Sequence, residues 1–478
     1  MTQKIKERIY ATGTWKANSA IHLGGEDGHL ENDVDMSLLR DSNGEFFIPG
    51  GSIAGAGRSQ LASRLLKASA FRGGLSNEPI DLQALFGGKY TSILTVSDAY
   101  QTSTKQALVR DGVRISPLTE TAEDHAKYNF EVLPAGASFD MKLCLVRYES
   151  AHPNSDEVTV LQYFQALLQA FESAGIRLGA RTRRGLGEGK VATWKVFRLS
   201  MANPAHVDAW LHKNWQETVA AEASSALCTE PLMTDLRRRM TITSSLAIKT
   251  SILIRTSGDS PGAPDMVHHT EARQLLLPGT SVAGAFLNRV EKIANTMVPD
   301  ARRRLTRLFR PAAPTTSETQ VAFRSSPITI DEGPLRGGQL MVQGRTAIDR
   351  FTGGTLSGAL FDEAPFWPDG TEAANWEFRV SLELEDEREQ DDPLEAALVL
   401  QAFKDLWLGD LAIGGETGGG RGVMRGISAI LTHPECGELK LAFRPGELTE
   451  AGIEIERGDW SVWNELGAIP KEVANAAY

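Results

Sequence analysis

One internal duplication limits the folds open to this chain of 478 residues more than any other feature of its sequence. A Pro-Gly turn followed by Ser and small residues occurs as Phe47–Gly55 (FIPGGSIAG) and again as Leu276–Gly284 (LLPGTSVAG), with the two prolines 229 residues apart. Two more pairs of segments follow in the same order, at separations of 233 and 235 residues: Ile115–Thr119 with Ile348–Thr352, and Ile176–Gly185 with Leu411–Gly420. Ordered repeats at a nearly constant separation indicate that one structural module was duplicated.

Both copies show the same order of expected elements. Each begins with an alternating strand and a polar, glycine-rich loop, and continues with the Pro-Gly turn, a helix and a long insertion. Each ends with another alternating strand, a second helix and a second glycine-rich loop. The expected elements are strands in Tyr10–Leu23, Asn129–Val146, Thr241–Ile254 and Trp376–Leu384, and helices in Val160–Ala174 and Pro393–Leu408. This order predicts an α+β protein of two tandem ferredoxin-like domains, each with a large insertion.

The repeat also predicts how the chain is divided. We assign residues 1–200 to the first domain and residues 240–433 to the second. Residues 201–239 have the pattern of a polar, helical connector. Residues 434–478 form a C-terminal extension that lies outside the repeat and has no assigned role.

Composition excludes several classes of protein. The 41% of hydrophobic and 23% of charged residues are ordinary for a globular protein, and no apolar run approaches the ~20 residues that a membrane helix needs. The N-terminus lacks the apolar stretch of a secretory signal, so we expect a cytoplasmic protein. The cysteines Cys144, Cys228 and Cys436 have no paired spacing, which argues against a zinc site or a disulfide framework.

The two Pro-Gly turns are candidate phosphate-binding sites. Each stands directly before an expected helix, where free backbone N–H groups and the helix dipole favour an anion. The candidate residues are Ser52, Gly55 and Arg58 in the first copy and Ser281 in the second. Leu287 takes the place of Arg58 in the second copy, with Arg289 nearby as a substitute cation. The alternative interpretation is an ordinary strand-to-helix turn with an N-cap.

The two later glycine-rich loops are further candidates. Glycines allow the backbone to approach a ligand closely, and arginines bind phosphate through a fork of N–H donors. The candidates are Gly179, Arg181, Arg183, Arg184 and Gly185 in the first loop, and Gly415, Gly419 and Arg421 in the second. Neither loop is a P-loop, because the Gly-Lys-Ser/Thr ending is missing. The alternative is a mobile glycine hairpin without a ligand.

An aspartate stands at the same place in both copies. Val34-Asp35-Met36 aligns with Pro264-Asp265-Met266, and each aspartate lies about a dozen residues before its Pro-Gly turn. An acidic surface loop is the ordinary interpretation. A carboxylate that recurs beside a phosphate-binding turn can instead hold a divalent ion or accept a proton from a ribose hydroxyl.

The ordered motifs resemble the RAMP superfamily backbone subunits of type III CRISPR effector complexes. In the first copy they are Ile21–Gly25 (IHLGG), Asp35, Leu39–Asp41 (LRD), Ile48–Arg58 (IPGGSIAGAGR), Val96–Ala99 (VSDA) and the Gly179 loop. In the second copy they are Pro278–Ser281 (PGTS), Ile330-Asp331, Ala347–Gly353 (AIDRFTG) and the Gly414 loop. The whole chain is similar to tandem fusions of two such subunits in type III-D-like systems.

The resemblance implies a palm that grips guide crRNA and a β-hairpin thumb in each half, with target RNA and other type III CRISPR subunits as partners. The thumbs would contain Ile115–Ala122 and Ile348–Thr355, and would flip a target nucleotide out of the guide–target duplex at regular intervals. The flipped position frees the target backbone for attack by a 2′-hydroxyl on its own phosphate.

The resemblance also implies the cleaving residues. The family's cleaving Asp begins the pattern D-x-x-x-x-R-D, which Asp35 fits together with Arg40 and Asp41. Asp265 fits in part, because Thr270 and Glu271 replace the Arg-Asp pair, and Asp33 is a nearby alternative in the first loop. We therefore expect Asp35 and Asp265 to bind Mg²⁺ or Mn²⁺ together with RNA.

Three functions remain open from the sequence. The first is an RNA-guided, metal-dependent endoribonuclease, the second a non-catalytic scaffold of the same complex, and the third a processor of guide precursors. Ala54 and Ala283 stand where the family often has Lys, which leaves the phosphate grip to backbone amides and Arg58. The net charge of −11 requires that positive charge be concentrated on the RNA-binding faces.

Overall fold

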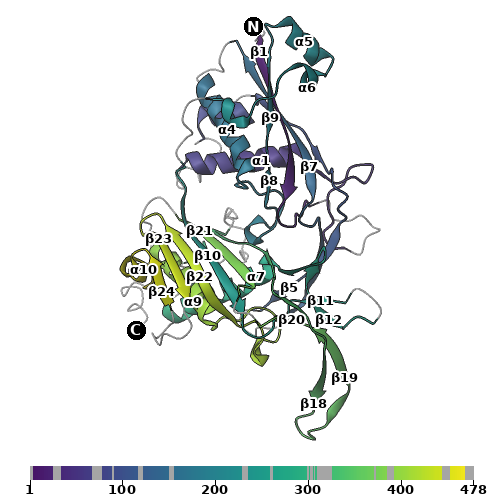
Figure 1. The fold of residues 1–478 in the computed structure, drawn as a ribbon, viewed down its shortest axis with the longest axis vertical. Coiled ribbons are helices and arrows are strands. Elements are labelled where there is room, and N and C mark those ends of the chain that lie inside the picture. The colour runs from purple at the N-terminus through teal and green to yellow at the C-terminus, as the bar shows by residue number, and fades with distance from the viewer. Residues whose placement is uncertain are drawn as a thin grey trace, which may run out of the picture.

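The protein is described by a computed structural model (Figure 1). The described residues are 4–24, 34–66, 78–88, 91–116, 122–149, 156–228, 235–258, 262–298, 301, 305, 307–308, 326–370, 373–384, 392–443 and 453–468. Asp33 lies outside these residues.

The first half folds around one antiparallel sheet. Its strands are β1 (Ile5–Ala17), β3 (Leu94–Val96), β7 (Ser138–Tyr148), β8 (Gly189–Val191) and β9 (Lys195–Ser200), in the order β3-β7-β1 with β8 and β9 both on the far side of β1. Helix α1 (Gly50–Leu65) follows the first strand, and α4 (Glu157–Glu172) follows the third. A central first strand between the third and the fourth is the ferredoxin-like arrangement, so the α+β prediction is confirmed.

Alternation along β1 positions the first core. Ile9, Ala11 and Trp15 are buried in the cluster that also contains the apolar faces of α1 and α4, because successive strand residues point to opposite faces. Phe164 and Phe171, two turns apart on α4, lie in the same cluster. Short elements complete this half: β2 (Phe47–Ile48), β4 (Ala99–Tyr100), α3 (Ile80–Phe86) and the 3₁₀ turn η2 (Thr182–Arg184).

The second half repeats the same order. Its sheet runs β15 (Ile328–Ile330), β21 (Trp376–Leu384), β10 (Arg238–Ile248), β22 (Met424–His433), with α7 (Gly279–Met297) after the first strand and α9 (Asp392–Leu408) after the third. Phe378 on β21 packs between Phe286 of α7 and Phe403 of α9, with ring centroids 5.4 and 6.2 Å apart. The short strands of this half are β11 (Arg255–Ser257), β12 (Met266–His268), β13 (Thr270–Glu271), β14 (Gln274–Leu277), β16 (Gly333–Pro334), β17 (Gly338–Leu340) and β20 (Phe366–Pro368), with the 3₁₀ turn η4 (Thr417–Gly419).

The connector and the C-terminal extension pack on the two sheets. The connector contains α5 (Pro204–Leu211), α6 (Trp215–Thr218) and the 3₁₀ turn η3 (Ser224–Ala226). Helices α5 and α6 lie against the face of the first sheet that α1 and α4 leave open, and Trp215 stacks there on Tyr10, with ring centroids 4.4 Å apart. In the extension, β23 (Gly437–Phe443) and β24 (Ile453–Arg457) continue the second sheet beyond β22, and α10 (Trp460–Gly467) packs on α9. Among the described helices, none has the length and apolar character to cross a membrane.

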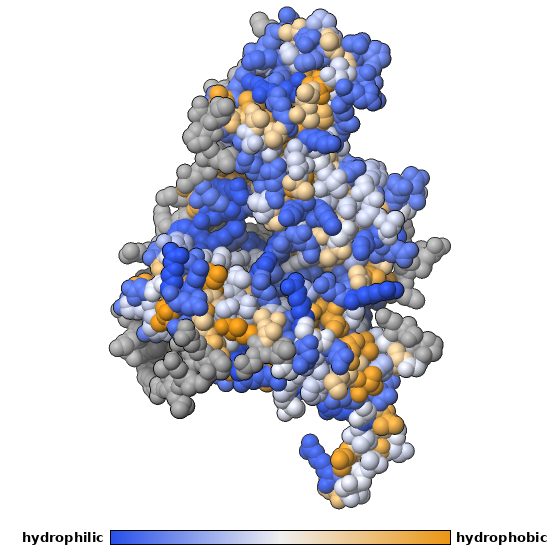
Figure 2. Space-filling view, in the orientation of Figure 1, coloured by the Kyte–Doolittle hydropathy of each residue, from blue (hydrophilic) through white to orange (hydrophobic). Residues whose placement is uncertain are grey.

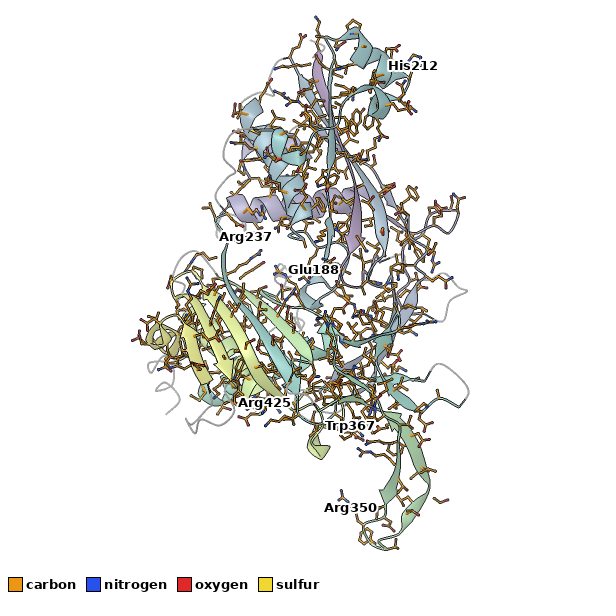
Figure 3. All side chains as sticks on the ribbon, in the orientation of Figure 1. Glu188, His212, Arg237, Arg350, Trp367 and Arg425 are labelled. Atoms are coloured by element: carbon orange, nitrogen blue, oxygen red, sulfur yellow. The ribbon has the colours of Figure 1, made fainter. Side chains whose placement is uncertain are left out.

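Each insertion contains a β-hairpin. In the first half, β5 (Leu108–Ile115) pairs with β6 (Ala122–Val132), and in the second half, β18 (Gln343–Ile348) pairs with β19 (Thr355–Ala364). Ile115 pairs with Ala122 in the first hairpin, and residues 117–121 of that expected thumb segment lie outside the described residues. The second expected segment, Ile348–Thr355, forms the end of the second hairpin. The second hairpin projects from the body of the molecule, and Arg350 marks its tip (Figure 3).

The two halves meet through charged side chains and close backbone contacts. The Arg110 guanidinium of the first hairpin is only 4% exposed and binds two buried carboxylates of the second half, with Nε 2.8 Å from Glu271 Oε2 and Nη1 2.8 Å from Glu332 Oε2. Arg177 spans the junction from Glu188 of its own half to Asp331 of the second half, at 3.2 and 2.6 Å. Figure 3 shows Glu188 where the halves meet.

This interface makes a testable prediction at Gly279, the first residue of α7. A Cβ at Gly279 would lie 2.2 Å from the carbonyl oxygen of Arg184 in the first half, so one half must shift. We expect Gly279→Ala to lower the free energy of unfolding by about 1–3 kcal/mol. Gly284→Ala is the matched control, because the same helix leaves open space at that position and alanine is favoured there by up to about 1 kcal/mol. Denaturant unfolding checks both variants, and equal stabilities would contradict this description of the interface.

Candidate functional site

Asp35 is fixed at the second strand of the first hairpin. Its backbone N–H donates to Asn129 Oδ1 at 2.6 Å, and the Asn129 N–H donates to Asp35 Oδ2 at 2.8 Å. Met36 then forms a parallel bridge with Phe130 on β6. The carboxylate is thus held by backbone geometry at the base of the hairpin, while the residue is exposed.

Asp265 occupies the equivalent position in the second half. The Asp362 N–H on β19 donates to Asp265 Oδ2 at 3.0 Å, and Met266 pairs in parallel with Glu363. The hydrogen-bond pattern matches that of the first half. There, Asn129 comes directly before Phe130 of the parallel bridge and donates its N–H to Asp35. The two sites differ in this donor residue, because Asp362 supplies a second carboxylate where the first half has Asn129.

The structure brings Arg181 of the first glycine-rich loop to the Asp35 segment. Its guanidinium lies over the rings of Phe130 and Tyr128, 4.2 and 4.9 Å from their centroids, and donates to Tyr128 Oη at 2.9 Å. Another N–H of the same group lies 3.6 Å from Met36 Sδ. Stacking on two aromatic rings orients this cation beside Met36, which follows Asp35 in the chain. Sequence motifs 146 positions apart therefore share one site.

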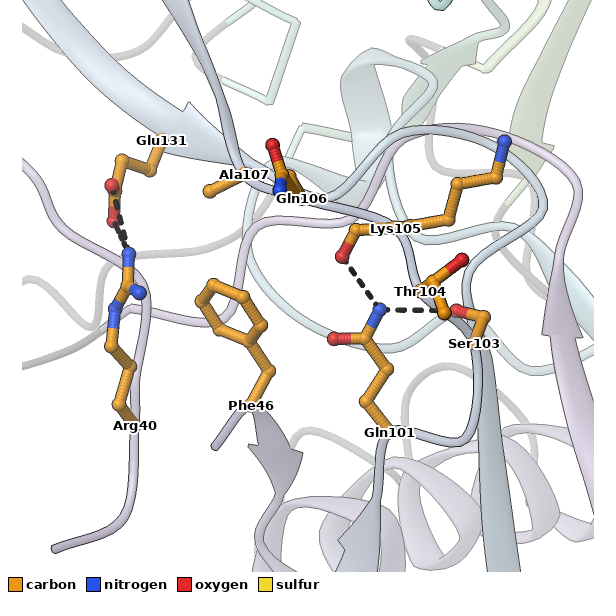
Figure 4. A pocket seen from close by; sticks show the side chains of 9 residues that line it. All are labelled: Arg40, Phe46, Gln101, Ser103, Thr104, Lys105, Gln106, Ala107 and Glu131. Carbon is orange, nitrogen blue, oxygen red and sulfur yellow. Dashed lines mark hydrogen bonds and ion pairs between the residues drawn. The ribbon is translucent and has the colours of Figure 1, made fainter. Parts of the chain in front are cut away.

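Arg40 of the D-x-x-x-x-R-D pattern opens onto a polar pocket of about 520 Å³ in the same region (Figure 4). Its guanidinium lies 4.3 Å from the Phe46 ring centroid and pairs with Glu131 at 3.0 Å. The remaining walls are Gln101, Ser103, Thr104, Lys105, Gln106 and Ala107. The pocket thus combines Lys105 and the ion-paired Arg40 with the Glu131 carboxylate, amides and hydroxyls.

The first helix start differs from the expected open phosphate cradle. The Gly50 N–H donates to Asp98 Oδ1 at 2.7 Å, so a carboxylate of the protein already stands at the positive end of α1. Ser52 and Gly55 are exposed on α1, but Arg58 is held by Glu78 through contacts of 2.6–3.2 Å. Arg58 is thus an ion-paired residue in this structure, and its contact with an RNA phosphate stays a prediction.

The first glycine-rich loop contacts the second half of the chain as well as the Asp35 site. Gly179 has φ +88°, and a Cβ there would lie 2.4 Å from the His22 carbonyl oxygen. A Cβ at Gly185 would lie 2.4 Å from the Glu332 nitrogen in the second half. Arg183 forms two contacts of 2.8 and 3.0 Å with Glu383, also in the second half. Arg183 is therefore an interface residue, while Arg184 is exposed in the same turn.

The second glycine-rich loop has a different chemistry. Arg421 is buried and pairs with Glu363 and Glu416 at 3.1 and 3.2 Å, and its contact with RNA stays a prediction. Gly419 is exposed at the loop tip, and Gly415 is half-buried. In the second helix start, Ser281 is half-buried, and Arg289 binds Asp405 at 2.6 Å.

Two groups of the first half have shifted pKa values: His22 lies near the first site, beside Phe130, and Cys144 lies on β7 opposite Tyr10. Burial lowers the pKa of His22, whose Nδ1 lies 2.7 Å from the Glu131 carbonyl oxygen, so this ring is neutral near pH 7 and adds no positive charge. Burial raises the pKa of the Cys144 thiol, which disfavours the reactive thiolate. Within the described part of the chain, no three His, Cys, Asp or Glu residues cluster closely enough to form a metal cage.

No sequence motif identified Asn129 and Asp362, the hairpin residues that hold the two aspartates. Asn129 and Asp362 are 233 positions apart, which is the separation of the repeated hairpin segments, so extending the repeat alignment would have paired them. The motif comparison named Glu271 only as a replacement for Asp, and no motif identified Glu131, Glu271 or Glu332 as the partner of an arginine.

The fold and the sites define a class of protein: two ferredoxin-like domains in tandem, each with a hairpin that presents one aspartate at its base. The family model of the RAMP superfamily matches residues 15–190 and 246–425, and the chain belongs to this superfamily. The two matched regions confirm a tandem fusion, and membership implies a subunit of a type III CRISPR complex. No curated protein matches the chain.

Proposed function

We propose that this protein is a backbone subunit that binds guide crRNA and cleaves complementary target RNA at two positions, one at Asp35 and one at Asp265. One observation carries the proposal: both aspartates accept a backbone N–H from the same register position of a hairpin strand. Duplicated geometry around an exposed carboxylate suits a reaction that is repeated at a fixed spacing along one strand.

Positive charge near the first site supports contact with RNA phosphates. Arg181 contacts Met36, and Lys105 lines the same pocket as Arg40, although the chain carries a net charge of −11. Base pairing with the guide reads the target sequence in such complexes, so the protein needs only contacts to the backbone and shape of the duplex.

Both hairpins carry exposed apolar side chains. On the second hairpin, Ile348, Leu356 and Leu360 are exposed, and Phe351 at the tip is 99% exposed. Figure 2 shows apolar residues along this projection. On the first hairpin, Val113 and Ile115 are exposed as well. Apolar side chains inserted between bases unstack them, so each hairpin would interrupt the duplex and flip a target nucleotide.

The chemistry follows from this interruption. The 2′-hydroxyl of the flipped nucleotide attacks its own 3′-phosphate, and the bond from phosphorus to the 5′-oxygen of the next nucleotide breaks. That oxygen takes a proton from water, so the products carry a 2′,3′-cyclic phosphate and a 5′-hydroxyl. Asp35 and Asp265 accept the 2′-hydroxyl proton, and the backbone N–H on one carboxylate oxygen keeps each group in place.

The residues fit Mg²⁺ or Mn²⁺ held jointly with RNA. Mg²⁺ is commonly bound by one or two carboxylates together with substrate phosphates and water. Asp35 would supply one carboxylate, and Asp265 together with Asp362 would supply two. When bound, the ion stabilises the charge that develops on the phosphate oxygens.

A non-catalytic scaffold of the same complex is the second candidate. The second site favours the scaffold function in part. Glu271, which replaces the Asp of the motif, binds Arg110 of the first hairpin. Cleavage assays on the guide-loaded complex decide: if the wild-type chain never cuts, the scaffold is correct, and if the chain with both aspartates replaced still cuts, the carboxylate assignment is wrong.

RNA binding itself predicts a salt dependence. We expect the logarithm of guide affinity to fall linearly with the logarithm of salt concentration, by about 0.7 per phosphate contact. Arg181→Ala should reduce this slope by about one contact. Arg457→Ala on β24 is the matched control, because that exposed side chain lies at the far edge of the second sheet. A slope near zero for the wild-type chain would contradict phosphate binding.

A further inference from the structure

A network of ion pairs lies beside Asp265 at the base of the second hairpin. Its centre is Glu363, which is 1% exposed and pairs with Arg421, Arg255 and Arg345 at 3.1, 3.2 and 3.6 Å. Glu416 pairs with the same three arginines at 3.2, 3.4 and 2.9 Å. Three cations meet two carboxylates, so the network has one surplus positive charge. Arg421 is buried, whereas Arg255 and Arg345 are 47% and 39% exposed.

The first half contains no such network at the equivalent positions. The glycine-rich loops align through Arg181 and Glu416, which both precede a 3₁₀ turn in the left-handed conformation. With this alignment and the hairpin register, each network residue has an equivalent in the first half. Arg255 corresponds to Gly24, Arg345 to Gly112, Glu363 to Phe130, Glu416 to Arg181, and Arg421 to Leu186. An aromatic-stacked cation in the first half is thus replaced by a charged network in the second.

The network adjoins the second aspartate directly. Glu363 follows Asp362, whose N–H binds the Asp265 carboxylate at 3.0 Å. Arg255 on β11 pairs with His268, three positions beyond Asp265 on β12. Figure 1 shows β11 and β12 at the base of the hairpin formed by β18 and β19.

The second loop lacks the motif arginine, since Thr270 stands where the first loop has Arg40. We propose that Arg255 and Arg345 bind the target-RNA phosphate beside Asp265, so that the second site obtains its cations from β11 and β18. This inference rests on the proposed function. Each guanidinium carries five N–H donors, and the buried Glu363 orients the fork while part of it stays accessible to a phosphate. Cations fixed in advance need little reorganisation when the substrate binds.

The test measures target-RNA affinity against salt concentration in a guide-loaded complex that carries Asp35→Ala and Asp265→Ala. Adding Arg255→Ala or Arg345→Ala should reduce the slope by about 0.7–0.9 each, because each removes one phosphate contact. Arg255→Lys should keep the slope, and Arg457→Ala is the matched control. Slopes that stay unchanged in both alanine variants would overturn the inference, because a purely structural role does not alter counterion release.

A second readout uses complexes with both aspartates intact. Arg255→Ala and Arg345→Ala should each slow the cut assigned to Asp265 by at least about tenfold and leave the cut assigned to Asp35 unchanged. Equal slowing of both cuts would count against a local role. Failure of the proposed function is a separate result, since it appears as cleavage that persists when both aspartates are replaced.

Discussion

Asp35→Asn should slow one of the two target cuts by about 10²–10⁴-fold in the guide-loaded complex, and Asp265→Asn should do the same to the other. Asparagine keeps an oxygen that can accept the hairpin N–H, so the variant removes the negative charge and the proton acceptor with little change in structure. Gel analysis of end-labelled target RNA gives the rate of each cut separately.

The matched control for this pair is Asp208→Asn, because Asp208 is an exposed aspartate on α5 in the connector. We expect both cuts to proceed at the wild-type rate in this variant. Two unchanged cuts in the Asp35→Asn, Asp265→Asn double variant would remove both residues from the reaction.

Arg110→Met should lower the free energy of unfolding by about 3–5 kcal/mol, because it leaves two buried carboxylates without their cation. Burial first, and then the neighbouring Glu332, raise the pKa of Glu271 even in the wild-type chain, while Arg110 opposes this shift. An acid with a raised pKa in the folded state stabilises the fold below its ordinary pKa and loses this contribution as pH rises through the raised value. Without Arg110, the pKa of Glu271 in the folded state rises further. The free energy of unfolding lost through Arg110→Met should therefore be larger at about pH 8 than at about pH 5.

Arg114→Met on the same strand provides the comparison. Arg114 is 76% exposed and lies 3.6 Å from Glu123, so its replacement should cost less than about 1 kcal/mol. Denaturant unfolding at the two pH values measures both variants. A loss for Arg110→Met that matches Arg114→Met would show that the ion pairs of Arg110 with Glu271 and Glu332 do not hold the halves together.

The architecture was predictable because it depends on local patterns. Strand Trp376–Leu384 was expected with the same bounds that the structure shows, since its alternating side chains face a core on one side only. The repeat likewise aligned Asp35 with Asp265, because equivalent residues of a duplicated module keep their positions in the fold, whereas the hairpins were expected from the family resemblance. The extension beyond residue 434 was not predictable as sheet, since β23 and β24 have no counterpart in the repeat.

The partners of charged side chains could not be predicted in the same way. Arg58, Arg183 and Arg421 were expected to contact RNA on the strength of residue type, yet the structure pairs each of them with a glutamate. Those glutamates lie 20, 200 and 58 positions away. Local sequence shows that a cation is present, whereas only the folded chain shows whether a carboxylate already binds it. Arg181 differs from these three arginines, because its guanidinium stacks on the rings of Tyr128 and Phe130.

Photo-crosslinking from the two hairpins tests the central claim most directly. Tyr128 and Phe361 occupy equivalent positions, next to Asn129 and Asp362, and each can carry a photoreactive side chain in the guide-loaded complex. The account predicts crosslinks to one and the same target strand, at two places separated by the distance between the two cuts. Crosslinks at a single place, or none to the target strand, would contradict it.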